Sequence, residues 1–527
     1  MFGSRRPGVI AGSFGSRIRR LTGAVAAILL TALQARGGDH LERVQLLCTT
    51  DIHGVLDEAV EKGSAERQGW LRLATLIRER RASFGDDRTL LLDCGDTGQG
   101  TLAAALSRGG LAPTLLRTLE YDVWVPGNHE FDYGVRRLSE LCNAVPKKVL
   151  CGNAELIVDR RRHRYPAWRM FSLGDNADVA VIGATASYLS NWLWGDHMRS
   201  FRVIGLEELI SDVLPAILRR QPEMIVLATH QGWLHNDTRS VNEIARIADR
   251  FPEIDLILGG HTHREFGGMQ LRSGTWYVQA GAHGRHLALI RADVDTEHHR
   301  VVNLASILEP VGMHTDVDPR AQAAVDKLRR ETAAFAQRTI GSFAAGISSY
   351  GTPGETCRTS EFLCTVIAAQ TDADVVIHGR HSRFSIRAGN FREQDLFHLI
   401  PYENRIGVAS LTAAQIRAII EEQWQKRESY VYCGLWGLQA DIDRNGSVRK
   451  LRLPDGAAVS DDRRFRTAFN SYTAAGGGGR FPDMRRLIRL PASNLRDTGL
   501  NTREAVRRFL QNRPDFRLRM RRWIHTP

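Results

Sequence analysis

Short apolar runs alternate with amphipathic stretches through the first part of the chain, from residue 44 to residue 308. The apolar runs occupy residues 44–51, 89–96, 178–184, 224–230 and 254–261, and the amphipathic stretches include 71–81, 207–220 and 241–250. Continuous apolar strands that alternate with helices are typical of an α/β domain whose sheet is covered on both faces. Each run ends in Asp, His or a small residue, and strand ends are where such folds place their chemistry.

A charged, alanine-rich segment separates this region from a second one. Residues 316–337, with Pro319 near their start, predict an exposed helix between two domains. Beyond it, the pattern predicts a second α/β unit with helices at 360–370 and 412–425, a strand at 374–379 and a glycine run at 476–479. We therefore divide the chain into residues 1–39, 40–312, 313–339 (the linker helix), 340–512 and 513–527.

The distribution of net charge along the chain limits which kinds of partner the protein can bind. The 527 residues carry a formal charge of +12, but residues 1–36 and 503–527 contribute +6 each, so that the region between them is neutral. A globular body that binds a nucleic acid polymer needs a basic surface, and we therefore expect no such polymer as a partner. We interpret the arginine-rich tail at 513–527 as a solvated end, with contact to a membrane or a polyanion as the alternative.

The N-terminus has the outline of a signal peptide. A basic stretch at 17–20 precedes an apolar run at 21–33, which is too short to span a bilayer comfortably. We expect an exported protein, periplasmic or extracellular. The alternatives are an uncleaved anchor, which would bring the protein into contact with a membrane, and a buried helix. The seven cysteines contain no CxxC pair and imply no disulfide framework.

Five segments of the first domain supply metal-type ligands at predicted strand ends. A single His in such a position is more often structural than a ligand, but five segments in succession change that expectation. Two divalent ions roughly 3.5–4 Å apart need several oxygen and nitrogen ligands each, and a carboxylate that bridges them. The candidate ligands are Asp51, His53, Asp96, Asn128, His230, His261 and His263, and His129 follows Asn128 directly.

In their order along the chain, these motifs resemble a known family. D-x-H, GD-x-x-Q-G, GNHEFD, H-x-G and GGH-x-H are similar to the motifs of the binuclear metallophosphatases, specifically the secreted two-domain 5'-nucleotidase and UDP-sugar hydrolase family. The resemblance covers residues 44–512. It implies a metallophosphatase-type β-sandwich flanked by helices (the calcineurin-like domain), a linker helix, and a smaller C-terminal α/β domain of the nucleotidase type that binds the substrate.

The resemblance also implies roles for the motif residues. Asp51, His53 and His263 would hold one ion, Asn128, His230 and His261 the other, and Asp96 would bridge both. His129 would stabilise the leaving oxygen or donate a proton to it, and Asp132 would orient the imidazole, although Asp132 could instead be a turn-forming residue. The mixed nitrogen and oxygen ligands suit Mn, Zn, Fe or Co without selecting one of them.

The match to the family weakens in the second domain. Residues 378–383 read HGRHSR where the family has NGGGIR, so that Arg383 matches a substrate-binding Arg and His378 replaces an Asn. Arg383 could instead be a surface salt-bridge residue. Residues 399–404 resemble a Pro-aromatic-x-Asn segment. In residues 469–481, Tyr472 stands at the position that stacks on a base, but Gly478 replaces an Asp that contacts the ribose, and Arg480 replaces a Tyr. Trp436 would supply a second stacking face or belong to the core.

These observations favour an exported, divalent-metal-dependent phosphohydrolase. We expect its substrate to be a small-molecule phosphate ester, first of all a nucleoside 5'-monophosphate that it hydrolyses to nucleoside and phosphate. The alternatives are 2',3'-cyclic nucleotides, nucleotide sugars or other phosphate esters, and a catalytically silent protein that binds a ligand in the same pocket. The sequence makes no prediction of oligomeric state.

Overall fold

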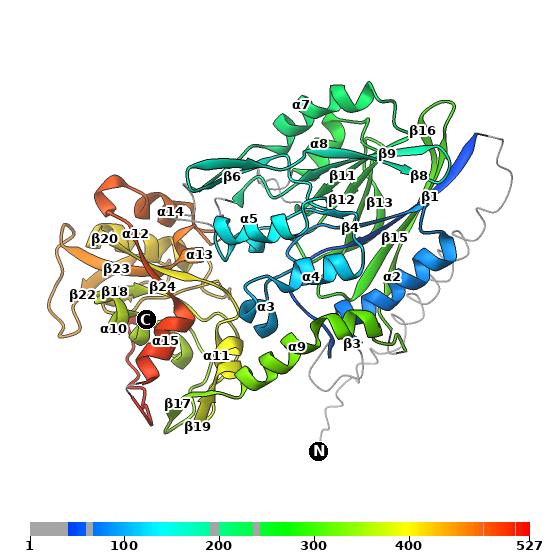
Figure 1. Cartoon of the computed structure of the whole chain (residues 1–527). Helices are drawn as coiled ribbons and strands as arrows, with labels where there is room; N and C mark the ends of the chain where they lie inside the picture. Colours follow the sequence, from blue (N-terminus) through cyan, green and yellow to red (C-terminus); the bar gives the residue numbers. More distant parts are fainter. Residues whose placement is uncertain are drawn as a thin grey trace, which may run out of the picture.

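The computed structural model describes residues 40–59, 67–189, 200–234, 243–312, 314–429, 431–477, 479–511 and 513–526. The predicted signal or anchor segment and Gly478 lie outside these residues. Figure 1 shows a larger N-terminal domain and a smaller C-terminal domain, with helix α9 running along the side where they meet. Across the described parts of the chain, no helix is both long enough and apolar enough to cross a membrane.

Two sheets form the N-terminal domain. The first has the order β16 (Arg300–Pro310), β15 (His286–Asp295), β1 (Leu41–Thr49), β4 (Thr89–Asp93) and β5 (Val123–Trp124). The second has the order β13 (Glu265–Gln270), β14 (Trp276–Ala280), β12 (Leu256–Leu258), β11 (Met224–Thr229), β9 (Ala177–Ala184) and β8 (Trp168–Leu173). Strands β1, β4 and β5 run parallel, as do β9, β11, β12 and β14, so that each set has its carboxyl ends at one edge.

Alternating side chains of the strands build three layers of core. Leu46 and Leu90 point between the sheets and pack with Val226 of the facing sheet. Their neighbours Leu47 and Leu91 point the other way, into a cluster with the covering helices. This division follows from the two-residue period of a strand. The predicted α/β fold, with a β-sandwich flanked by helices, is confirmed.

Helices cover both outer faces of this sandwich. Helices α2 (Trp70–Phe84), α4 (Leu111–Thr118) and α5 (Val135–Ala144) pack on the first sheet, and α7 (Leu206–Leu218) and α8 (Ile244–Arg250) pack on the second. Three of the predicted amphipathic stretches therefore form helices. The remaining elements of this domain are β2 (Glu58–Ala59), β3 (Arg67–Gln68), α3 (Leu102–Leu106), η1 (His129–Phe131), β6 (Ala154–Val158), β7 (Arg161–Arg164) and β10 (Phe201–Val203).

Helix α9 (Pro319–Ala336) is the predicted linker helix. Its N-cap is Asp318, whose Oδ1 accepts a hydrogen bond from Ala321 N at 2.7 Å, and Pro319 occupies the first turn. Both features are preferred at helix starts because the first N–H groups have no partner within the helix. The described side chains of α9 are largely exposed, and Ala321 and Val325 are the ones buried against the first domain.

The C-terminal domain is a four-stranded sheet with helices on both faces. Its order is β18 (Val375–Ile377), β23 (Arg464–Asn470), β20 (Arg405–Thr412) and β24 (Arg496–Asn501). Helices α10 (Arg358–Thr371) and α15 (Thr502–Gln511) pack on one face, and α12 (Ala413–Trp424) and α14 (Pro482–Ile488) on the other. The smaller elements are β17 (Thr339–Phe343), β19 (Gly389–Arg392), α11 (Glu393–Leu399), β21 (Gln439–Ile442), β22 (Val448–Arg452), α13 (Ser471–Ala474), η3 (Pro491–Ser493) and β25 (Ile524–His525).

The arginine-rich tail is not a solvated end, and this prediction was wrong. Strand β25 pairs in parallel with β21, and Trp523 is 3% exposed, with its indole N–H donating to Glu361 Oε2 at 2.8 Å. Along residues 516–521 the apolar side chains are half-buried and the three alternating arginines are exposed. This period of two was visible in the sequence, but the density of arginine concealed it. Trp436 packs against Trp523 at 5.3 Å between ring centroids, which confirms its assignment to the core.

Replacing Trp523 by Ala should release this tail from the domain. Loss of a buried Trp costs about 3 kcal/mol, so the thermal midpoint of the C-terminal domain should fall, and limited proteolysis should cleave after residue 512. Arg519→Ala, which changes an exposed side chain of the same segment, is the matched control and should leave both readouts unchanged. A Trp523→Ala midpoint equal to that of the control would contradict the packing role.

Candidate active site

The predicted ligands follow strand ends that meet at one edge of the sandwich. Asp51 and His53 follow β1, Asp96 follows β4, His230 follows β11, and the GGHTH segment follows β12. Five of these residues have a positive φ, in the left-handed region that costs a non-glycine residue about 1–3 kcal/mol: Asp51 (51°), His53 (54°), Asp96 (53°), His261 (69°) and His263 (57°). Such backbone persists only where the surroundings fix it, and here it turns the side chains toward one another.

The first ligand group consists of Asp51, His53 and His263. The Nε2 atoms of the two imidazoles lie 2.9 Å apart, and Asp51 Oδ1 lies 3.9 Å from that of His53 and 3.4 Å from that of His263. Asp51 is fully buried, and its Oδ2 accepts hydrogen bonds from the Thr50 hydroxyl and from His261 N. The remaining lone pairs of the three side chains therefore converge on one point.

The second group consists of Asp96, His230 and His261, with Asn128 beside it. Asp96 Oδ2 and Asn128 Oδ1 lie 3.1 Å and 3.2 Å from His230 Nε2. Asp96 Oδ2 also lies 4.0 Å from His53 Nε2 in the first group. Asp96 thus stands between the two groups, as a bridging carboxylate must. All seven predicted ligands come together in the structure.

Backbone carbonyls fix the imidazole tautomers. The Nδ1 of His53 lies 2.9 Å from Gln99 O, and the Nδ1 of His230 lies 2.7 Å from Cys94 O. A carbonyl can only accept, so both Nδ1 atoms carry a proton that they donate. The Nε2 atoms that face the ligand groups are then the atoms left to bind a cation, which is the usual arrangement in metal sites.

Burial and neighbouring charge set the protonation of these groups. Burial lowers the pKa values of His53 and His261 to about 3, so both rings are neutral and offer a lone pair. Burial would raise the pKa of Asp96, but the adjacent His230 outweighs it and holds that pKa well below its usual range. Asp96 in turn overcomes the effect of burial on His230 and raises its pKa to about 9. Positive charge is thus favoured beside Asp96, where a proton and a metal ion would compete.

Glu130 is a functional residue that the sequence analysis missed. Its carboxylate accepts four backbone hydrogen bonds, from Gly127 N (2.7 Å), Thr97 N (2.8 Å), Asp96 N (2.9 Å) and Gly98 N (3.1 Å). It therefore joins the loop after β4 to the loop after β5 and fixes the backbone of Asp96. The sequence feature that could have identified Glu130 is its place in the GNHEFD motif, directly after Asn128 and His129.

Two glycines allow these loops to approach each other. A Cβ at Gly127 would lie 2.3 Å from Asp96 Oδ1, and a Cβ at Gly95, where φ is 91°, would lie 2.4 Å from Gly127 N. Both distances are impossible for a real side chain, so the glycines are required by the close packing around Asp96.

His129 and Asp132 form a hydrogen-bonded pair next to the ligand groups. The Nδ1 of His129 lies 2.8 Å from Asp132 Oδ2, and its backbone N–H donates to Asp96 Oδ1 at 2.8 Å. Burial would lower the pKa of His129, but the carboxylates of Asp132 and Asp96 outweigh it and raise the pKa to about 10. The imidazole is therefore protonated at neutral pH, with its Nε2–H turned away from Asp132.

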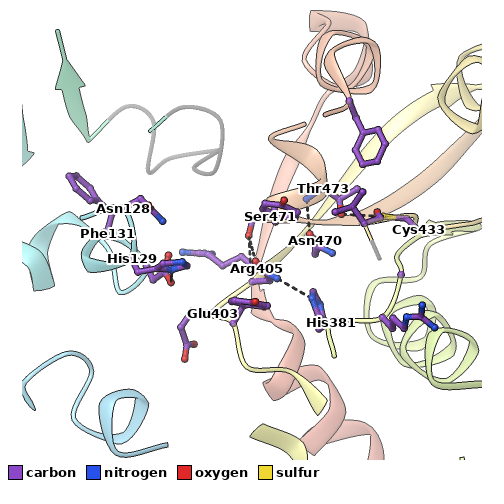
Figure 2. Close-up of a pocket in the computed structure, with 18 residues that line it drawn as sticks. Asn128, His129, Phe131, His381, Glu403, Arg405, Cys433, Asn470, Ser471 and Thr473 are labelled. Carbon is purple, nitrogen blue, oxygen red and sulfur yellow. Dashed lines mark hydrogen bonds and ion pairs between the residues drawn. The ribbon is translucent and has the colours of Figure 1, made fainter. Parts of the chain in front are cut away.

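A cavity of about 240 Å³ connects this pair to the C-terminal domain. Figure 2 shows Asn128 and His129 on one side of it, and Asn470, Ser471 and His381 on the other. The cavity is also lined by Tyr402 and Tyr472. The ring of Tyr402 lies parallel to that of His129, 6.4 Å away between centroids. Gln99 Nε2 donates to Pro401 O at 3.2 Å, which ties the two domains together beside the cavity.

The substrate-binding residues predicted in the C-terminal domain are only partly brought together. Tyr472 lines the cavity, and Arg480 donates to its hydroxyl at 2.9 Å. Arg383 is exposed and lines a different hollow, of about 340 Å³. His378 is fully buried and does not line the cavity. The substrate roles of these residues stay predictions.

Two other residues near the site were missed. Tyr402 lies in the segment noted for its Pro-aromatic-x-Asn pattern, but a single exposed Tyr gave no reason to single it out. The ring of His283 lies 5.7 Å from those of His53 and His263. Like the predicted ligands, His283 has a positive φ and lies near glycines, but a φ angle cannot be read from a sequence.

Comparison with known proteins identifies the two halves of the chain separately. Residues 44–265 match the family model of the calcineurin-like phosphoesterases, and residues 334–486 match that of the 5'-nucleotidase C-terminal domain. The chain belongs to the two-domain 5'-nucleotidase family. This confirms the family and the fold that the motifs indicated, and it supports the class of metal-dependent phosphoester hydrolases.

Individual relatives of this 5'-nucleotidase family member are distant. It is 23% identical to the trifunctional nucleotide phosphoesterase protein YfkN of Bacillus subtilis over 84% of its own length, but spans only 32% of that protein. It is 22% identical to the 5'-nucleotidase of Bos taurus, over 82% of this chain and 83% of the relative. A putative 5'-nucleotidase from Staphylococcus aureus has the same fold, with a TM-score of 0.78 at 19% identity over 92% of this chain and all of that one.

The donor atoms fit the divalent metal ions that this family implies. Each group offers imidazole nitrogen and carboxylate oxygen, and Asn128 adds an amide oxygen to the second. This mixture suits Mn, Zn, Fe or Co. The structure supports two metal positions and does not select the element.

Two variants separate the metal positions from the histidine pair. His129→Ala should keep two metal ions per chain, because no predicted ligand is removed, while turnover falls by about 10² to 10⁴, the usual contribution of a general acid. Asp96→Asn should lose both metal and turnover. Metal analysis of the purified proteins, together with phosphate release, checks both. Unchanged turnover in His129→Ala would remove the proposed role of His129.

Proposed function

We propose that this protein is a metal-dependent phosphohydrolase that releases phosphate from nucleoside 5'-monophosphates. The observation that carries the proposal is one continuous cavity between the domains, which extends from His129 and Asp132 to Tyr402 and Tyr472. A phosphate at the ligand groups would place its leaving group in this cavity. Two tyrosine faces suit a planar base, because stacking tolerates any base.

The proposed chemistry divides between the metals and the chain's own residues. When bound, the two ions would neutralise phosphate charge and lower the pKa of a water nucleophile. Asp132 holds the imidazole of His129 by its Nδ1–H, so the Nε2–H is free to donate to the leaving oxygen. Burial would lower the pKa of His129, but the Asp132 carboxylate raises it, which favours the protonated ring that a proton donor needs.

Other phosphate esters form the second candidate class. Gly478 replaces the Asp that the family uses to contact the ribose, and a lost hydroxyl contact weakens discrimination between sugars by about 1–3 kcal/mol. This favours 2',3'-cyclic nucleotides or nucleotide sugars as further substrates. A silent binding protein would have no use for the His129–Asp132 pair, so we place it last. Export through the segment 1–39, to the periplasm or the outside of the cell, is proposed from the sequence alone.

Phosphate release from AMP in excess Mn²⁺, with EDTA as the blank, is the first test. We expect rapid release that EDTA abolishes, because the ligand groups are built to hold cations. If AMP is not cleaved while 2',3'-cyclic AMP or UDP-glucose is, the site is a phosphohydrolase with the second class of substrate. Hydrolysis of 2',3'-cyclic AMP or UDP-glucose leaves the phosphate on an organic product, so chromatography of the substrates is the readout for these two, and absence of cleavage of all three would overturn the enzymatic proposal.

The tyrosines can be tested by comparing two substrates. Tyr402→Ala and Tyr472→Ala should each raise KM for AMP by about 5-fold to 100-fold, in line with the stacking energy of one base. The KM for p-nitrophenyl phosphate, which has no base, should change little with Tyr472→Ala. Arg383→Ala is the companion variant in the same domain: an unchanged KM for AMP would favour its role as a surface residue. Equal KM for AMP in wild type and both Tyr variants would contradict the stacking.

A further inference from the structure

Two histidines of the C-terminal domain form a buried pair at the wall of the nucleotide cavity. His378 is fully buried at the end of β18, and its Nε2 lies 3.1 Å from the Nε2 of His381, which lines the cavity. The two rings meet edge to face, with centroids 4.7 Å apart. They occupy the segment where the sequence departs from the NGGGIR pattern of the family.

One carbonyl group fixes the protons of the whole pair. The Nδ1 of His378 lies 2.7 Å from Gly379 O, which can only accept, so Nδ1 carries the proton. Burial lowers the pKa of His378 to about 4 and that of His381 well below its usual range, so both rings are neutral. The Nε2 of His378 is then an acceptor, and His381 must donate to it from its own Nε2.

The proton position on His381 determines how the Asn404 amide is oriented. With its proton on Nε2, His381 presents a bare Nδ1, which lies 3.5 Å from Asn404 Nδ2 and accepts from it. On the other side, Ser471 Oγ accepts from Arg405 N at 3.2 Å and donates to Asn404 Oδ1 at 3.4 Å. His381 therefore identifies the nitrogen end of the Asn404 amide, and Ser471 independently identifies its oxygen end. The two neighbours require the same amide orientation.

We propose that His381 and His378 are positioning residues that fix the orientation of the Asn404 amide and thereby select a substrate with a planar base. Asn404 lines the same cavity as Tyr402 and Ser471. An amide held in one orientation keeps one N–H and one oxygen lone pair in fixed places, and a base that offers a neighbouring acceptor and donor pairs with both. A sugar or a simple alcohol lacks this rigid edge.

The inference rests on the proposed nucleotidase function and narrows it to nucleotides rather than phosphate esters in general. Neither histidine touches the reacting phosphate in this arrangement, so the pair should act on KM and leave kcat at the metal groups unchanged. A fixed amide also avoids the cost of ordering a side chain on binding.

The experiment compares His381→Ala, Asn404→Ala and the double variant. His381→Ala should raise KM for AMP roughly tenfold, the effect of one lost hydrogen bond, with kcat and the KM for p-nitrophenyl phosphate unchanged. If His381 acts through Asn404, the double variant should be no worse than Asn404→Ala alone, because coupled residues are not additive. His381→Gln keeps a donor and an acceptor on one side chain and should restore part of the loss. His398→Ala, an exposed histidine of the same domain, is the control.

Three results would overturn the positioning role: an unchanged KM for AMP in His381→Ala, fully additive effects in the double variant, or an equal rise of KM for p-nitrophenyl phosphate. Calorimetric titration of the Mn²⁺-loaded protein with adenosine separates this failure from that of the proposed function. Wild type that neither cleaves AMP nor binds adenosine would refute both ideas. Wild type that does both, with His381→Ala binding adenosine equally well, would refute only the role of His381.

Discussion

A buried carboxylate between two groups of imidazoles is the constraint on which the rest of this structure depends. Asp96 is 1% exposed, and burying its charge is costly unless positive charge compensates for it. The surrounding chain accepts strain to provide that compensation, with left-handed backbone at five of the seven predicted ligands. Such strain survives only where packing enforces it, and the clamp of Glu130 on the loop that carries Asp96 does so. The packing free energy of the β-sandwich compensates for this backbone strain.

The second domain completes a site that the first domain begins. His129 belongs to the N-terminal domain, yet its ring lies parallel to Tyr402 of the C-terminal domain, and both line the same cavity. In the proposed function, chemistry and recognition of the leaving group are therefore carried by different domains. Because the seven predicted ligands all lie in the N-terminal domain, the cavity wall in the C-terminal domain can change without disturbing the candidate metal positions. The exchange of glycines for His381 and Arg380 in this wall is such a change.

The tail shows where local sequence was misleading, and the histidine pair shows what burial adds to the sequence. Alternating arginines after residue 512 suggested a solvated end, but the apolar residues between them and Trp523 bury enough surface to add a strand to the domain. His378 was taken as a contact with substrate because of its alignment with a family position. His378 is fully buried behind His381 and does not line the cavity, and its substrate role stays a prediction.

The sequence by itself predicted the strands, the covering helices and the seven candidate ligands that the structure brings together, because buried strands and metal sites impose residue types at fixed local spacings. Tertiary structure decided what depends on approach between distant segments: the place of Asp96 between two groups, the four hydrogen bonds of Glu130, and the cavity between Tyr402 and His129. The histidine tautomers and the orientation of the Asn404 amide are also decided by the tertiary structure. They follow from which carbonyl faces which ring, and only the folded chain brings those atoms together.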